Sequence, residues 1–206
     1  MADNVTGLFP RGSTYNGPNK TLSSSYGVSV GLEGQMKHFK DVDSTSGSPG
    51  IKSQRSDRVV TCICVRNVSG FTVLPKRLVA WATGFVGRRI NGYTEATSEQ
   101  AAGVTDEFLS SSGARDEDLL WIQVKGPGLL NMPVGQVVDV SEGDALHCLT
   151  AATTNCTTAG RARPLIATSS VTDVKAQLIN RVGRALSAVS SSQTTGDVLV
   201  DLDILK

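Results

Sequence analysis

Residues 180–206 read NRVGRALSAVSSSQTTGDVLVDLDILK, two strand-like segments separated by a Ser/Gln/Thr/Gly turn. In the second segment, apolar side chains occupy one set of alternate positions and acidic ones lie between them: Val198, Val200, Leu202 and Ile204 against Asp197, Asp201 and Asp203. Successive side chains of a strand point to opposite faces, so this period of two indicates a half-buried strand. The stretch therefore predicts a β-hairpin that closes the chain.

The segments upstream have the same β character. RVVTCICVRNV (58–68) is apolar at nearly every position and rich in β-branched residues, which is typical of a strand buried on both faces. FTVLPKRLVAWAT (71–83) and LLWIQVKG (119–126) predict further strands, and QVVDVSEGDALHCL (136–149) predicts a hairpin that turns at residues 142–144. Short strands separated by turns favour a mainly β fold, a compact sandwich or barrel.

One segment departs from this pattern. Apolar residues in 171–189 recur at helical spacing, with Thr172 as an N-cap, and Gly183 interrupts them. We expect a short helix near residues 172–179, which passes into a strand at Asn180 or Arg181.

The first 55 residues have a different composition. Gly, Pro and Ser fill 20 of these 55 positions, and the larger apolar residues stand singly. Such a segment buries little apolar surface, so it is either a disordered tail or an extended arm that orders on a partner. We favour an extended arm over residues 1–55 and a β-rich body over residues 56–206. The candidate anchors on a partner are the isolated aromatic residues Phe9, Tyr15, Tyr26 and Phe39.

Composition excludes several functional classes. The 206 residues are 39% hydrophobic with a formal net charge of +1, which supports a core but not the coating of nucleic acid. No apolar run approaches the roughly 18 residues of a membrane span. The opening residues, MADNVTGLFPRGSTYN, lack the pattern of a secretory signal. We expect neither membrane nor direct nucleic-acid contact.

No residue constellation indicates catalysis, a cofactor or a metal. His147 and Cys148 are adjacent, so on a strand they point to opposite faces and cannot readily form a nucleophile–base pair. Cys62, Cys64, Cys148 and Cys156 are spaced poorly for zinc, and buried free thiols are favoured, with metal ligation or a disulfide left open. We expect a protein that is not an enzyme.

Two loop-like segments can each be interpreted either as a simple turn or as a ligand-binding site. Gly126-Pro127-Gly128 predicts a tight turn, since a dinucleotide site would need a helix opening there. The acidic run Asp116-Glu117-Asp118 could hold a cation but lacks the calcium-loop pattern, which favours a solvated turn.

Charge is unevenly distributed along the chain. Residues 58–89 hold six basic residues and no acidic one, whereas residues 95–118 hold seven acidic residues and one arginine. These charged residues either lie on solvated loops, or they form complementary patches that fix the register between neighbouring copies.

Two stretches resemble the capsid decoration (cement) proteins of tailed bacteriophages. One is the C-terminal hairpin with its G-R-A-L-x-A pattern, and the other is AAGVTDEFLSSSGARDEDLLWIQVKGPG (101–128). The resemblance implies a β-rich body, commonly a homotrimer, that sits on the capsid exterior and clamps neighbouring major capsid protein subunits. It also implies a virion protein that is assembled in the host cytoplasm. Alternatives are a neck or tail part, a secreted β-rich adhesin or binding module, and a small β-barrel enzyme.

Overall fold

The computed structural model describes residues 11–16, 22–23, 29–43, 53–94, 100–132, 139–148, 160, 162–164, 181–190 and 196–204. Every regular element in these ranges is a strand, so the mainly β prediction is confirmed. The expected helix at residues 172–179 lies outside the described residues. In the described part of the chain, no helix is long and apolar enough to cross a membrane.

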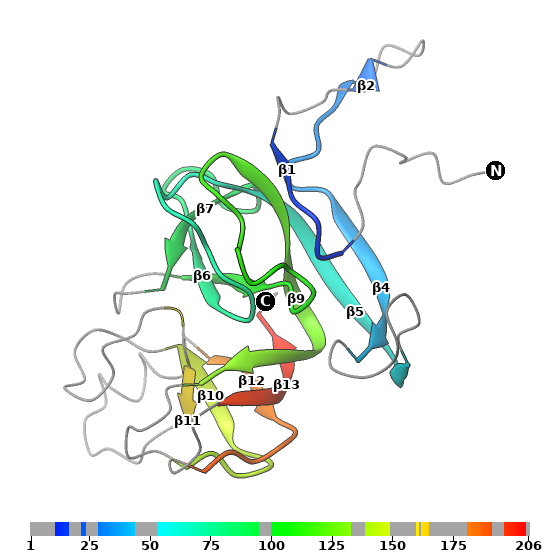
Figure 1. Ribbon diagram of the computed structural model, residues 1–206, viewed down its shortest axis with the longest axis vertical. Helices are drawn as coiled ribbons and strands as arrows, with labels where there is room; N and C mark the ends of the chain where they lie inside the picture. The colour runs from blue at the N-terminus through cyan, green and yellow to red at the C-terminus, as the bar shows by residue number, and fades with distance from the viewer. Residues whose placement is uncertain are drawn as a thin grey trace.

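Five strands close on themselves into a barrel (Figure 1). These are β5 (Gln54–Asn67), β6 (Leu78–Trp81), β7 (Arg89–Tyr93), β8 (Ala101–Thr105) and β9 (Asp118–Asn131). Antiparallel pairing runs from β5 through β9, β8 and β6 to β7. The ring closes where β7 pairs in parallel with the last residues of β5. Alternate side chains fill the interior, including Ile63, Val65, Val79, Ile90, Leu120 and Ile122.

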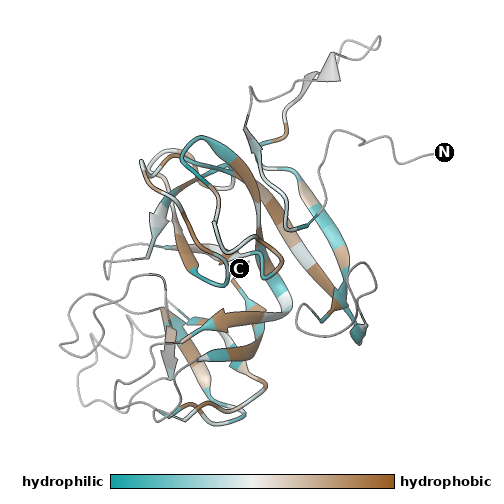
Figure 2. Ribbon diagram, viewed as in Figure 1, coloured by the Kyte–Doolittle hydropathy of each residue, from teal (hydrophilic) through white to brown (hydrophobic). Residues whose placement is uncertain are grey.

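Strand β9 is buried along most of its length, and β5 is buried on both faces from Val60 onward. Ile63 and Val65 point into the barrel, while Cys62 and Cys64 belong to a second cluster with Leu119 and Trp121. Figure 2 shows apolar residues along much of both strands. The prediction of a strand buried on both faces is confirmed for residues 60–67, where the barrel interior fills one face and residues from the N-terminal segment cover the other, whereas Arg58 and Val59 are exposed.

Strand β9 continues past the barrel into a second group of strands of the same sheet (Figure 1). There its second half pairs with β13 (Asp197–Asp203), followed by β12 (Arg181–Ala185), β10 (Ala145–Cys148) and β11 (Ala162–Pro164). The cluster beneath these strands includes Leu130, Leu146, Val182, Val198, Val200 and Leu202. One strand thus belongs to both halves of the molecule.

The prediction of a tight turn at Gly126-Pro127-Gly128 is wrong, because the three residues lie inside β9. Just before these residues, between Gln123 and Lys125, the pairing of β5 with β9 shifts register, as in a β-bulge. Gly126 has φ +90°, and a Cβ on it would lie 2.4 Å from the carbonyl oxygen of Val59. The Gln123 amide fills the space beside Gly128 and donates to the carbonyl oxygens of Gly126 and Pro127. These residues therefore redirect the strand without ending it.

The C-terminal hairpin is confirmed, since β12 pairs antiparallel with β13 and β12 begins at Arg181, as expected. The hairpin predicted for residues 136–149 is wrong. A turn does occur at residues 142–143, but Val140 bridges Val189, and β10 pairs with β11 and β12. The residues on the two sides of the turn thus pair with strands further along the chain and not with each other. Residues 133–138 lie outside the described ranges.

Two strands from the first 55 residues, β1 and β4, lie in the same sheet as the body. β4 (Met36–Val42) pairs antiparallel with β5, and β1 (Tyr15–Asn16) pairs with the start of β9. β2 (Leu22–Ser23) and β3 (Ser29–Val30) form a separate two-stranded sheet. The change in composition near residue 55 therefore falls at the start of a strand that pairs with β4.

Candidate functional site

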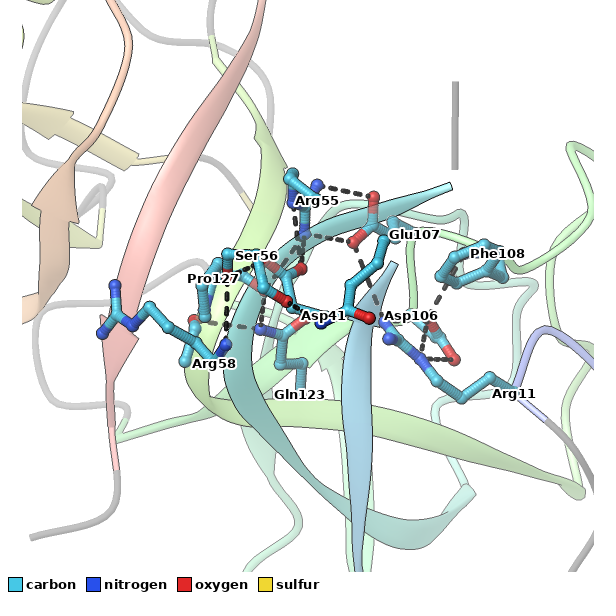
Figure 3. Close-up of polar contacts among 12 residues, drawn as sticks. Arg11, Asp41, Arg55, Ser56, Arg58, Asp106, Glu107, Phe108, Gln123 and Pro127 are labelled. Carbon is cyan, nitrogen blue, oxygen red and sulfur yellow. Dashed lines mark hydrogen bonds and ion pairs between the residues drawn. The ribbon is translucent and has the colours of Figure 1, made fainter. Parts of the chain in front are cut away.

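Arg11 fastens the N-terminal segment to the barrel through buried carboxylates (Figure 3). Its guanidinium donates to both oxygens of Asp106, with Nη2 2.8 Å from Oδ1, and Gly12 adds a backbone N–H to Oδ2. The same guanidinium lies 4.6 Å from the ring centroid of Phe108 and 5.7 Å from that of Phe39. Burial alone would lower the pKa of Arg11, but attraction and hydrogen bonding to Asp106, together with neighbours such as Glu107, raise that pKa overall.

Arg55 forms the other half of this arrangement. Its Nη2 lies 2.6 Å from Asp41 Oδ1 and 3.0 Å from Glu107 Oε1, and it also donates to the carbonyl oxygen of Pro127. Burial works to lower the pKa of Arg55, and hydrogen bonds to Asp41 and Glu107 raise it overall. The hydroxyl of Ser56 donates to the second oxygen of Asp41.

We refer to these five residues as the ion cluster: Arg11, Asp41, Arg55, Asp106 and Glu107. Its carboxylates are almost completely buried, and each is paired with an arginine. Because the members come from the N-terminal segment, β4, β5 and the turn after β8, the cluster ties these pieces together. Most of its polar atoms are engaged with one another, which indicates a structural role, although Arg11 Nη1 is buried without a hydrogen-bond partner among the described residues.

Two of the four predicted anchors lie among the described residues. Tyr15 and Phe39 pack against the cluster that contains Trp121, and the rings of Phe39 and Trp121 meet edge to face with centroids 5.5 Å apart. Both residues therefore make contacts inside the molecule. Phe9 and Tyr26 lie outside the described residues.

The cysteines Cys62 and Cys64 are free thiols buried beneath the N-terminal segment, as favoured from the sequence. Burial raises the pKa of both, that of Cys64 to about 12, so they stay protonated near neutral pH. His147 and Cys148 are both buried in β10, and Cys156 is outside the described ranges. Among the described residues, no three His, Cys, Asp or Glu side chains are grouped to hold a metal.

Much of the uneven charge is paired within the chain. Arg66 and Arg89 each donate to one oxygen of buried Glu33, at 2.7 and 2.9 Å. In the acidic run, Asp116 accepts from the backbone of Gly70, and Asp118 accepts from the backbone N–H of Arg115. Many of the charged residues considered for contacts between neighbouring copies therefore hold loops and strands together within one copy.

Glu33→Gln is expected to destabilise the fold by about 1–3 kcal/mol near neutral pH, through weaker hydrogen bonds to Arg66 and Arg89. Burial would raise the pKa of Glu33, but these two bonds lower it overall. Its contribution is therefore complete above the unfolded pKa of about 4.5 and is lost as pH falls through the lower folded pKa. Urea unfolding from about pH 7 to pH 3 should show the difference from the parent protein shrinking. The exposed control Glu142→Gln should change little, and a constant Glu33→Gln deficit at all pH values would contradict this assignment.

On the surface lies an exposed apolar patch, here called the aromatic patch, formed by Phe71, Leu74 and Tyr93. Phe71 is 42% exposed and Leu74 39%. The rings of Phe71 and Tyr93 lie 5.5 Å apart, and the Tyr93 hydroxyl accepts the backbone N–H of Leu74 at 2.7 Å. Gly92 makes room for the Phe71 ring, because a Cβ there would lie 2.5 Å from it.

The loop that carries this patch is held in place by Asn67. Its side-chain amide donates to the carbonyl oxygens of Phe71 and Arg115 and accepts from the hydroxyl of Ser69. The strand expected over residues 71–83 is thus shorter than predicted: regular pairing begins at Leu78, and Val73 makes one isolated bridge with Ala114. A pre-ordered apolar surface of this kind suits protein binding. In the sequence, the aromatic patch could have been recognised from Phe71, an aromatic residue directly after the turn residues Ser69-Gly70.

No family model and no curated protein matches this chain. Among solved structures, the chain is similar to the N base of the head fiber protein gp8.5 of bacteriophage phi29. That similarity has a TM-score of 0.38 and 16% identity, and it covers 69% of this chain and 93% of the other. An overlap this low does not define a shared fold, so the function is argued from the residues of this chain.

Proposed function

We propose that the protein is a structural component of a phage virion that binds the outer surface of the capsid and stabilises contacts between major capsid protein subunits. The observation that carries this proposal is the aromatic patch, an apolar surface fixed on a rigid barrel. The C-terminal hairpin of the decoration-protein resemblance, now seen as the pair β12–β13, supports it. The proposed role involves no catalytic step and no cofactor.

The physical basis of this role is surface burial by a pre-ordered loop. Phe71 and Leu74 each offer apolar area worth about 25 cal/mol per Å² on burial. Because Asn67 and Tyr93 already order the loop, little conformational entropy is lost on binding. A homotrimer, which is part of this proposal, would present three copies of the patch and gain affinity through effective concentration.

The N-terminal residues contribute to this proposal in two ways. Phe9 and Tyr26 remain candidate anchors on the major capsid protein. Tyr15 and Phe39 contribute to the stability of the protein, because they pack against the cluster that contains Trp121.

Phe71→Ala is expected to weaken binding to phage heads that lack this protein by roughly tenfold or more, as for a central interface aromatic residue. Co-sedimentation of purified protein with such heads measures this. Phe85→Ala is the matched control, because Phe85 is 41% exposed but lies in the loop between β6 and β7, next to Arg89. Equal binding by both variants and the parent protein would show that the aromatic patch does not contact the capsid.

A further inference from the structure

The strand β4 forms one edge of the large sheet, and its outer side has no strand beside it in the described part of the chain. Four of its seven residues are exposed, namely Met36, Lys37, His38 and Lys40. An open edge presents backbone N–H and C=O groups that can pair with another chain.

The hydrogen bonds next to β4 show which backbone groups face outward. The N–H and C=O of Cys64 both bond toward the β4 side, to Gln35 and Gly34. Direction alternates along a strand, so Cys62 and Val60 also bond toward β4, and their partners are Lys37 and Phe39. The backbone groups of Met36, His38 and Lys40 therefore point away from β5.

The side chains on this edge select the kind of strand that can join it. Lys37 lies 5.2 Å from the ring centroid of Phe39, and His38 Nδ1 lies 3.1 Å from the Thr61 hydroxyl, so both are held beside the edge. Lys40 is exposed beyond them. Two copies of β4 would bring like charges together, which opposes self-pairing. An extended segment with acidic side chains would be attracted instead.

We propose that β4 accepts an extended acidic segment of a partner protein as an additional strand, hydrogen-bonded to the backbone of Met36, His38 and Lys40. The exposed side chains of Met36 and Val59 give apolar residues of that segment a place to pack. This site is separate from the aromatic patch, so it stands or falls independently of binding through Phe71.

The test uses the full chain and two synthetic peptides, one alternating Asp with Val and one alternating Lys with Val. Amide exchange by NMR should show slow exchange at Lys37 and Phe39 in the free protein and faster exchange at Met36, His38 and Lys40. The Asp peptide should slow the outward amides by roughly tenfold, whereas the Lys peptide should not. Equal protection by both peptides, or none by the Asp peptide, would overturn the proposal.

Two variants separate backbone pairing from charge. His38→Pro removes an outward-facing N–H, which an edge strand tolerates, and should weaken binding of the Asp peptide by roughly tenfold, whereas His38→Ala should not. Lys40→Glu leaves the backbone intact and should reduce binding of the Asp peptide while improving that of the Lys peptide. Circular dichroism checks that each variant is folded. Unchanged binding by folded His38→Pro would overturn the backbone contact, and an unchanged peptide preference of Lys40→Glu would overturn the charge selection.

Discussion

Removal of residues 1–43 is expected to unfold the body, not merely to shorten an arm. The deletion strips Leu32 and Phe39 from the face that holds Trp121, and it takes Arg11 and Asp41 out of the ion cluster. Each large buried apolar side chain contributes about 2–5 kcal/mol, and a domain has only about 5–15 kcal/mol in total. The summed loss is therefore comparable with the whole stability of the domain.

Thiol labelling followed by peptide mass spectrometry measures this directly. Cys62 and Cys64 lie beneath the deleted residues, so both should change from protected to reactive. Removal of residues 1–10 alone is the control, because it leaves the contacts of Arg11 in place. A protein without residues 1–43 that keeps native circular dichroism and protected Cys62 and Cys64 would show that the N-terminal cover is dispensable.

Arg55→Met is expected to cost about 3–5 kcal/mol, because it leaves Asp41 and Glu107 buried without their shared counter-ion. Arg58→Met, three residues along the same strand, is the matched control. Arg58 is 49% exposed and pairs with Asp201 at the surface, so its loss should cost about 0–1 kcal/mol. Urea unfolding of both variants provides the comparison. Equal stability of the two would mean that the ion cluster contributes no more than a surface pair.

The elements that the sequence predicted well are those whose burial follows from local pattern. The strand through Trp121, the doubly buried strand through Cys62 and the hairpin ending at Asp203 all have such a pattern. Their side chains alternate, or are apolar throughout, over a length that a strand requires.

The features that the sequence did not predict depend on contacts between distant residues. Arg11 meets Asp106 across 95 positions, and Arg55 meets Glu107 across 52, which no local pattern encodes. Gly126 is needed in β9 because a Cβ there would clash with the carbonyl oxygen of Val59, and only the fold brings these two residues together. The role of Phe39 in the core could not be predicted either, because residues 1–55 have a low apolar content, and nothing in the sequence indicates that this one ring packs against Trp121.

Quantitative mass spectrometry of purified virions tests the central claim most directly. If the protein binds across the capsid exterior and stabilises the major capsid protein lattice, its copy number should be comparable with that of the major capsid protein, and it should be lost from virions with the Phe71→Ala change more readily than with Phe85→Ala. A copy number matching the neck and tail proteins, or absence from the virion, would contradict the account.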